Sequence, residues 1–114
     1  MEKINTVLEK YNNFKYEQIR SVEHNADGSK VIKLVIQDDE GEDVSSVNFE
    51  FSDIKDLRIL EDGVLSFLDM TSGITLIKEN GLYGFAIGSG TAMLHVHSAP
   101  MYVIASDVKI SEEK

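Results

Sequence analysis

The sequence contains no cysteine. Without thiols, the chain has no disulfide scaffold, no thiolate ligand for a metal ion and no cysteine nucleophile. It also lacks any stretch of about 18 uninterrupted apolar residues, so we expect no transmembrane helix. The first residues, Met1 to Thr6, lack the basic region, apolar stretch and small-residue cleavage site of a signal peptide. Together these absences predict a cytoplasmic protein.

Positive charge is scarce as well. The chain has 11 lysines and arginines against 20 aspartates and glutamates, which gives a net charge of −9. Such a surface repels nucleic-acid phosphates and anionic lipids, so we expect neither a nucleic acid nor a membrane as a partner. A basic protein partner is compatible with this charge. Solubility alone would also account for it.

The length of 114 residues fits a single domain, residues 1–114, and the apolar fraction of 42% is that of an ordinary globular protein. Residues 2–13 predict a helix, because four apolar residues fall on one face of a 3.6-residue period. The residues on that face are Ile4, Val7, Leu8 and Tyr11. Asn12 and Asn13 are the expected stop signals for this helix.

Residues 15–110 predict short strands separated by glycine-containing turns. Apolar and polar residues alternate over 47–52, as in a half-buried strand, and Asn80-Gly81 is typical of a tight hairpin turn. The expected strands cover 15–24, 30–38, 47–52, 57–60, 64–68, 74–77, 82–87, 91–97 and 101–110, and a polar tail covers 111–114. We therefore predict an α+β, mainly β fold, in which the N-terminal helix packs on a curled antiparallel sheet of about eight or nine short strands.

The segment between the second and third expected strands is strongly acidic. Its acidic residues are Asp38, Asp39, Glu40, Glu42 and Asp43. The segment lacks the sixth-position glycine and the terminal glutamate of an EF-hand calcium loop. We interpret it as an electrostatic contact for lysine or arginine side chains of a partner, or else as a solvated hairpin loop.

A second unusual segment carries no charge. Leu82 through Ser106 is a stretch of 25 residues without aspartate, glutamate, lysine or arginine. Strands with one solvated face usually carry some charge on that face. These strands are either covered on both faces, by the N-terminal helix and by another sheet layer, or present one face to a second copy of the chain. The second alternative predicts a homodimer.

His95 and His97 form a His-x-His pair, and on the expected strand 91–97 both rings would project to the same face. The spacing resembles that of cupin metal sites. However, no acidic residue follows before Asp107, and the third histidine, His24, is far away in the sequence. Two imidazoles alone make an incomplete metal site, so we predict no metal and no cofactor.

Enzymatic activity is not predicted either. The glycine-rich segment 84–90 matches neither the phosphate-binding loop nor the dinucleotide-binding fingerprint. Most acidic pairs fall in expected turns, where carboxylates lack the enclosed pocket that shifts the pKa of a catalytic group. No nucleophile, base and orienting group can be named together.

The segment 47–59 combines an alternating apolar strand, a short aspartate–aliphatic bend and a Leu-x-Ile strand. It resembles small bacterial immunity-type proteins encoded beside polymorphic toxins, whose length and strand order also fit residues 31–110. The aromatic residue that often follows the mid-chain glycine in such proteins is present only as Tyr83. The resemblance implies a cytoplasmic inhibitor that binds and neutralises a cognate toxin.

Three functional hypotheses follow. The preferred one is a non-enzymatic protein-binding module, in particular an immunity-type inhibitor of a toxin. An alternative is a self-associating structural or assembly protein of phage or bacterial origin, joined through the uncharged strands 82–106. The third is a small-molecule or metal-binding β domain that uses His95 and His97.

Overall fold

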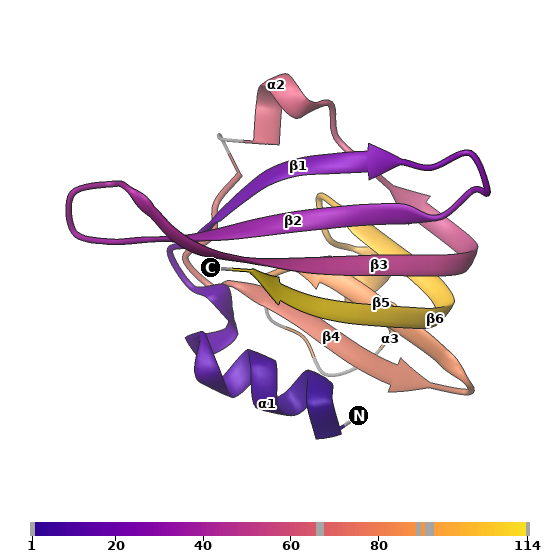
Figure 1. Cartoon of the computed structure of the whole chain (residues 1–114). Helices are drawn as coiled ribbons and strands as arrows, with labels where there is room; N and C mark the ends of the chain where they lie inside the picture. Colours follow the sequence, from indigo (N-terminus) through magenta and orange to yellow (C-terminus); the bar gives the residue numbers. More distant parts are fainter. Residues whose placement is uncertain (1, 66–67, 89, 91–92, 114) are drawn as a thin grey trace.

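The computed structural model describes residues 2–65, 68–88, 90 and 93–113. In this part of the chain, six antiparallel strands form one sheet (Figure 1). The strands are β1 (Gln18–His24), β2 (Lys30–Gln37), β3 (Asp43–Arg58), β4 (Ile74–Glu79), β5 (Leu82–Ile87) and β6 (Tyr102–Glu113). Their order is β1-β2-β3-β6-β5-β4, so the two longest strands, β3 and β6, lie at the centre. The predicted mainly β, antiparallel fold is confirmed.

The two central strands bend near Asp53 and Ser106. Asp53 has a φ of 53°, and the Ser106 hydroxyl donates a hydrogen bond to its carboxylate. Before the bend Phe51 faces the core, and after it Ile54 packs against the core, three positions later instead of the two of a regular strand. The register also shifts between Ile54 and Asp56. This bend curls the sheet around a single main core.

Phenylalanines form the centre of that core. The Phe49 ring lies 5.8 Å from the Phe14 ring and 5.7 Å from the Phe85 ring, measured between centroids. Phe51 meets Phe85 edge-on at 5.5 Å. All four side chains are completely buried. Tilted and edge-on ring pairs of this kind add about 0.5–1.5 kcal/mol each beyond the burial of their area. The alternation predicted for 47–52 is confirmed, because Val47, Phe49 and Phe51 all face the core.

The N-terminal helix is shorter than predicted. Helix α1 covers Glu2–Lys10, and one 3-10 turn, η1 (Asn12–Phe14), follows it. Asn12, Asn13 and Phe14 have φ values of 52°, 55° and 59°, in the left-handed region that asparagine tolerates better than most side chains. The asparagines therefore end the helix, as their stop signals predicted, and the expected extension to residue 13 is wrong.

Helix α1 packs against the sheet through the predicted face. Val7 is buried, and Leu8 and Tyr11 pack against the main core. Figure 1 shows α1 at the side of the curled sheet, near the end of β6. None of the helices in the described ranges has the length and hydrophobicity needed to cross a lipid bilayer.

The predicted count of eight or nine strands is wrong. The expected strand 57–60 is the end of the long β3, which continues past the bend to Arg58. The expected strand 64–68 overlaps helix α2 (Asp62–Leu65), and residues 66–67 lie outside the described residues. Short apolar runs do not distinguish a helix from a strand by periodicity, which explains the second error.

Two further expectations near the C-terminus are corrected. The expected strand 91–97 contains helix α3 (Met93–His97), while 91–92 lie outside the described residues. The Met93 N–H donates to the Glu79 carboxylate at 3.1 Å, so a side chain at the end of β4 accepts a hydrogen bond from the first turn of this helix. The expected polar tail belongs to β6 as far as Glu113, and residue 114 is not among the described residues.

Candidate functional site

The acidic loop joins β2 to β3 and projects beyond the end of the sheet (Figure 1). The Asp38 carboxylate organises it by accepting hydrogen bonds from the N–H groups of Glu40 and Glu42, at 2.9 and 3.0 Å. The Asp38 N–H donates to the Glu42 carbonyl oxygen at 2.9 Å. Gly41 closes the turn with a φ of 83°, a conformation that favours glycine. The loop backbone is therefore held by its own contacts.

Asp43 anchors the base of the loop to the sheet. Its Oδ1 atom accepts one hydrogen bond from Gln37 and one from Arg20, both at 3.0 Å. The hydrogen bond from Gln37, and then the positive charge of Arg20, hold the pKa of Asp43 below its ordinary value. Because Arg20 belongs to β1, this contact joins the edge strand to the loop across β2.

The five predicted contact residues therefore divide into two groups. Asp38 and Asp43 are engaged in holding the loop. The carboxylates of Asp39, Glu40 and Glu42 are exposed, and they make no hydrogen bond or ion pair with any part of the chain that the structure describes. The loop thus presents three carboxylates from a fixed backbone, an arrangement suited to receiving lysine or arginine side chains.

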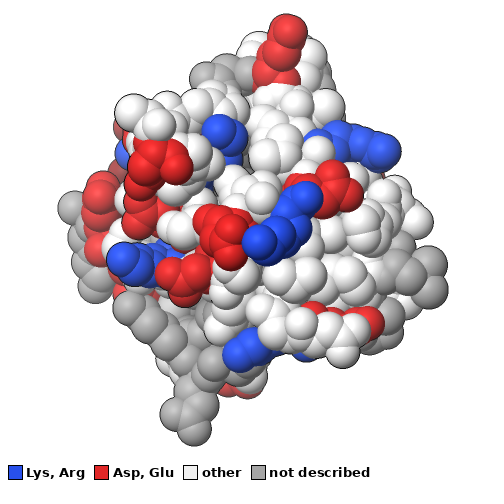
Figure 2. Space-filling model, turned by 90° about the vertical axis from the view of Figure 1, so that its right-hand side faces the viewer, with Lys and Arg blue, Asp and Glu red and all other residues white. Residues whose placement is uncertain are grey.

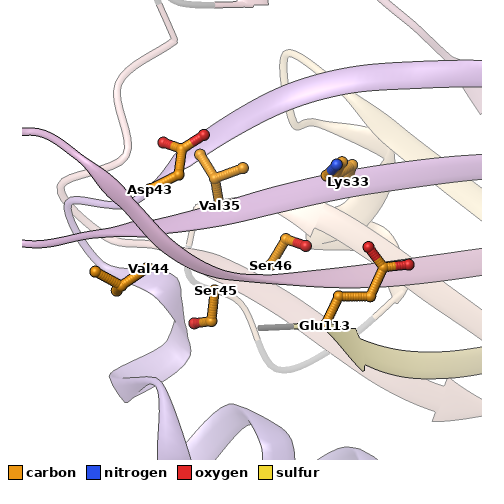
Figure 3. A pocket seen from close by; sticks show the side chains of 7 residues that line it. All are labelled: Lys33, Val35, Asp43, Val44, Ser45, Ser46 and Glu113. Atoms are coloured by element: carbon orange, nitrogen blue, oxygen red, sulfur yellow. The ribbon is translucent and has the colours of Figure 1, made fainter.

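A hollow of about 170 Å³ lies beside the loop, on the face of the sheet that points away from the main core (Figure 3). Val35 and Ser46 are buried here although neither belongs to that core. Charged side chains on three strands also line it, namely Lys33, Asp43 and Glu113, and its remaining lining residues are Val44 and Ser45. Sequence reasoning missed this hollow because it placed Glu113 in a tail and could not align β2, β3 and β6.

One face of the molecule carries charge of both signs (Figure 2). Figure 2 shows a face on which acidic and basic side chains lie next to one another. Lys55 and Asp53 pair at 3.0 Å, and Lys10 and Glu112 pair at 3.2 Å. Exposed pairs of this kind contribute little to stability, but they neutralise the local field. The loop, in contrast, carries three neighbouring exposed carboxylates that have no partner in the described chain.

The two histidines do not share a face. They lie on helix α3, where residues two positions apart point about 200° apart. His95 lies against Gly90, whereas the His97 Nδ1 atom lies 3.6 Å from the Asp56 carboxylate. The strand geometry predicted for the pair is wrong, so His95 and His97 have no common site to form. Among the residues described, no group of three or more histidine, aspartate or glutamate side chains could hold a metal ion.

His97 instead belongs to a polar cluster that sequence reasoning did not find. The Tyr102 hydroxyl donates to the Asp56 carboxylate at 3.2 Å, and Arg58 donates to the carbonyl oxygen of Ala99 at 3.1 Å. Burial, and then the Asp56 carboxylate, raise the pKa of Tyr102, so both favour the neutral phenol that donates this hydrogen bond. The cluster fastens the end of α3 to β3 and β6. Its members are too far apart in the sequence for any local pattern to reveal it.

The uncharged stretch 82–106 forms β5, α3 and the start of β6. Helix α3 covers the outer face of these strands, with Val96 fully buried in a small second core beside Ala86 and Ile104. The main core covers the other face. The structure therefore supports burial on both faces, although α3 takes the place of the expected cover. The exposed large apolar residues of the described chain all lie elsewhere; they are Tyr16, Val44, Leu57 and Val64. Self-association through 82–106 stays a prediction.

Comparison with known proteins finds no matching family model, no matching curated protein and no matching solved structure.

Proposed function

We propose that the protein is a non-enzymatic protein-binding module whose acidic loop contacts a basic partner. The observation that carries the proposal is that the loop carboxylates fall into two groups with different contacts. Asp38 and Asp43 hold the backbone, whereas Asp39, Glu40 and Glu42 are exposed and unpaired within the described chain. A loop that is already ordered loses little conformational entropy when a partner binds.

The loop would act first on the rate of encounter. Exposed carboxylates attract a basic surface over about 8 to 10 Å at physiological ionic strength. Complementary charge of this kind raises association rates and selects partners more than it adds to final affinity. The proposal therefore includes a strong dependence of the association rate on salt.

Within this class, we propose a cytoplasmic immunity-type inhibitor of a toxin. The resemblance of the segment 47–59 to immunity-type proteins supports this choice. The acidic loop supports it too, because a nuclease toxin binds phosphate through cationic side chains that three carboxylates could occupy instead. The inhibitor would then block the toxin by covering its substrate site.

Site-specific photo-crosslinking tests the proposal in cells of the source organism. A benzoylphenylalanine at position 40, in the loop, is expected to form an adduct of one defined mass. The same group at position 61, also exposed, serves as the control. The crosslinked protein is then identified and expressed alone. If the crosslinked protein arrests growth and coexpression of this chain restores growth, the result would support the immunity-type inhibitor. Identical adducts at both positions would overturn the assignment of the partner contact to the loop.

A further inference from the structure

Half of the central strand β6 has a neighbour on one side only. From Asp107 to Glu113, β6 pairs with β3. On its other side, the pairing with β5 ends where Tyr83 meets Ala105. In the described chain, no strand pairs with the second side of residues 107–113. The sheet therefore has an open edge in the middle of its strand order.

An open edge presents backbone hydrogen-bonding groups. Along an antiparallel strand, the N–H and C=O groups of alternate residues point to opposite neighbours. Residues 107–113 use one set on β3, so the other set points away from it. Proteins normally cover or block such an edge, because it acts as a template for another strand.

Helix α1 lies beside this edge and forms a groove with it. The groove has a volume of about 480 Å³ and is lined by Thr6, Val7 and Lys10 from α1 and by Ile110 and Glu112 from β6. The Lys10–Glu112 ion pair, at 3.2 Å, joins the two elements at one end. Between Val7 and Ile110 the lining is aliphatic, so the groove offers apolar contacts next to unused backbone groups.

We propose that this groove receives an extended segment of a partner protein, which adds a strand antiparallel to β6. Strand addition at a sheet edge draws affinity from main-chain hydrogen bonds and specificity from alternate side chains. Every second side chain of the incoming strand would face the groove and should be aliphatic. The others would lie beside the solvent-facing side chains of β6, which are Asp107, Lys109, Ser111 and Glu113.

Charge complementarity fixes the pattern of the incoming segment. Opposite Glu113 and Asp107 it should carry lysine or arginine, and opposite Lys109 it should carry glutamate or aspartate. A segment with the order basic, aliphatic, polar, aliphatic, acidic, aliphatic, basic meets these requirements. A second copy of β6 fits less well, because each copy would bring its own α1 to the same edge.

This inference rests on the proposed function in taking the partner to be a protein, but it uses different residues. Glu112 lines the groove and the adjacent Glu113 lines the hollow beside the acidic loop. Because successive side chains of a strand point to opposite faces, the two surfaces lie on opposite sides of the end of β6. One partner could contact the loop with basic side chains and the groove with an extended segment.

The test uses the heptapeptide acetyl-Lys-Val-Thr-Val-Glu-Val-Lys-amide and the whole chain labelled with ¹⁵N. We expect binding with chemical-shift changes along β6 from 107 to 113 and slower hydrogen exchange of the alternate amides that face the groove. The charge-swapped peptide, with glutamate and lysine exchanged, should bind at least about fivefold more weakly, because it sets like charges opposite each other.

Backbone methylation separates strand addition from other modes of binding. Two further peptides carry N-methyl groups on odd or on even positions. One of the two peptides should bind at least about tenfold more weakly, because its methyl groups replace the N–H groups that would bond to β6. The other peptide, methylated on the N–H groups that point away from β6, should bind as the unmethylated peptide does. Equal affinity of both methylated peptides, or shifts that map away from β6, would overturn the proposal, and so would absence of binding.

Variants of α1 complete the test. Thr6→Trp should fill the groove and abolish peptide binding, whereas Asn5→Trp, exposed on the same helix and not among the groove residues, should leave it unchanged. Replacing Asp39, Glu40 and Glu42 by their amides should also leave heptapeptide affinity within about twofold. The test of peptide binding in the groove is therefore independent of the test of the acidic loop. If the chain dimerises without peptide and the groove-facing amides of β6 are protected from exchange in the dimer, a second copy is the occupant, and the proposal of a partner segment is overturned.

Discussion

The carboxylate of Asp38 accepts a hydrogen bond from the backbone N–H of Glu42 at 3.0 Å, and the Glu42 carbonyl accepts one from the Asp38 N–H at 2.9 Å. These reciprocal contacts close the acidic loop on itself. Side chains of aspartate commonly organise turns in this way. The turn of the loop therefore depends on Asp38, while Asp43 anchors its base.

The first prediction concerns this order. Asp38→Ala removes the acceptor and should speed hydrogen exchange of the Glu40 and Glu42 amides about fivefold, because a net hydrogen bond contributes about 1 kcal/mol. Asp38→Asn retains an acceptor oxygen and should change exchange much less. Exchange measured by NMR checks both variants. Equal protection in wild type and Asp38→Ala would show that the rest of the hairpin holds the loop.

The second prediction concerns Gly73, which has a φ of 71° and lies against the Asn13 backbone with no room for a Cβ atom. Gly81 has a similar φ of 79° but open space around it. Gly81→Ala should cost about 1–2 kcal/mol of unfolding free energy from the backbone conformation alone. Gly73→Ala should cost about 1–3 kcal/mol more, because the left-handed turn at Asn13 must also move. Denaturant unfolding compares the two, and equal costs would contradict the close contact.

The third prediction concerns acid stability. The Thr71 hydroxyl and N–H both donate to Asp69 and lower its pKa, and Ser29 does the same to Asp27. A carboxylate with a lowered folded-state pKa stabilises the fold above its unfolded pKa, near 3.8, and this contribution is lost as the pH falls through the folded value. The melting temperature should therefore fall as the pH is lowered below about 4.

Thr71→Val provides the matched variant for this titration, because it removes the hydroxyl donor and leaves the charge of Asp69 in place. Its melting temperature should be lower than that of the wild type at about pH 6, and the two should converge as the pH falls through the folded-state pKa of Asp69, because the carboxylate is then lost in both chains. A gap that stays constant over this range would assign the Thr71 effect to packing instead of to the carboxylate.

The fourth prediction concerns Tyr102. Burial and the Asp56 carboxylate together raise its pKa. Asp56→Asn keeps the shape of the contact and removes the charge, so the pKa of Tyr102 should fall while staying above its ordinary value, since burial remains. The ring-carbon chemical shift of Tyr102, followed with pH, measures this directly. An unchanged pKa would show that the charge of Asp56 does not act on the phenol.

Much of the fold could be predicted from local patterns. Alternation over 47–52, the turn at Asn80-Gly81 and the stop at Asn12 are all properties of neighbouring residues, and each is confirmed. The errors fall where distant contacts decide the structure. Helix α3 starts on a carboxylate from β4, and the polar end of β6 is a strand because β3 pairs with it. No local signal carries that information.

The same reasoning applies to the sites. The acidic loop is one contiguous segment, so the sequence could locate it, although not the separate role of Asp38. The hollow, the groove beside β6 and the cluster around Asp56 each combine residues from several elements. Their formation depends on strand register, which composition and periodicity leave undetermined. His95 and His97 illustrate the reverse case, because their pairing depended on a strand that does not form.

The most direct test of the central claim compares association rates of two variants of equal charge with the crosslinked partner at low salt. One replaces Asp39, Glu40 and Glu42 by their amides, and the other replaces the exposed Glu9, Glu23 and Glu61 by theirs, so each changes the net charge from −9 to −6. If the loop steers binding, the association rate of the first variant should be about tenfold lower than that of the wild type, and the rate of the second should stay within about twofold of it. Equal rates for the two variants would contradict the account.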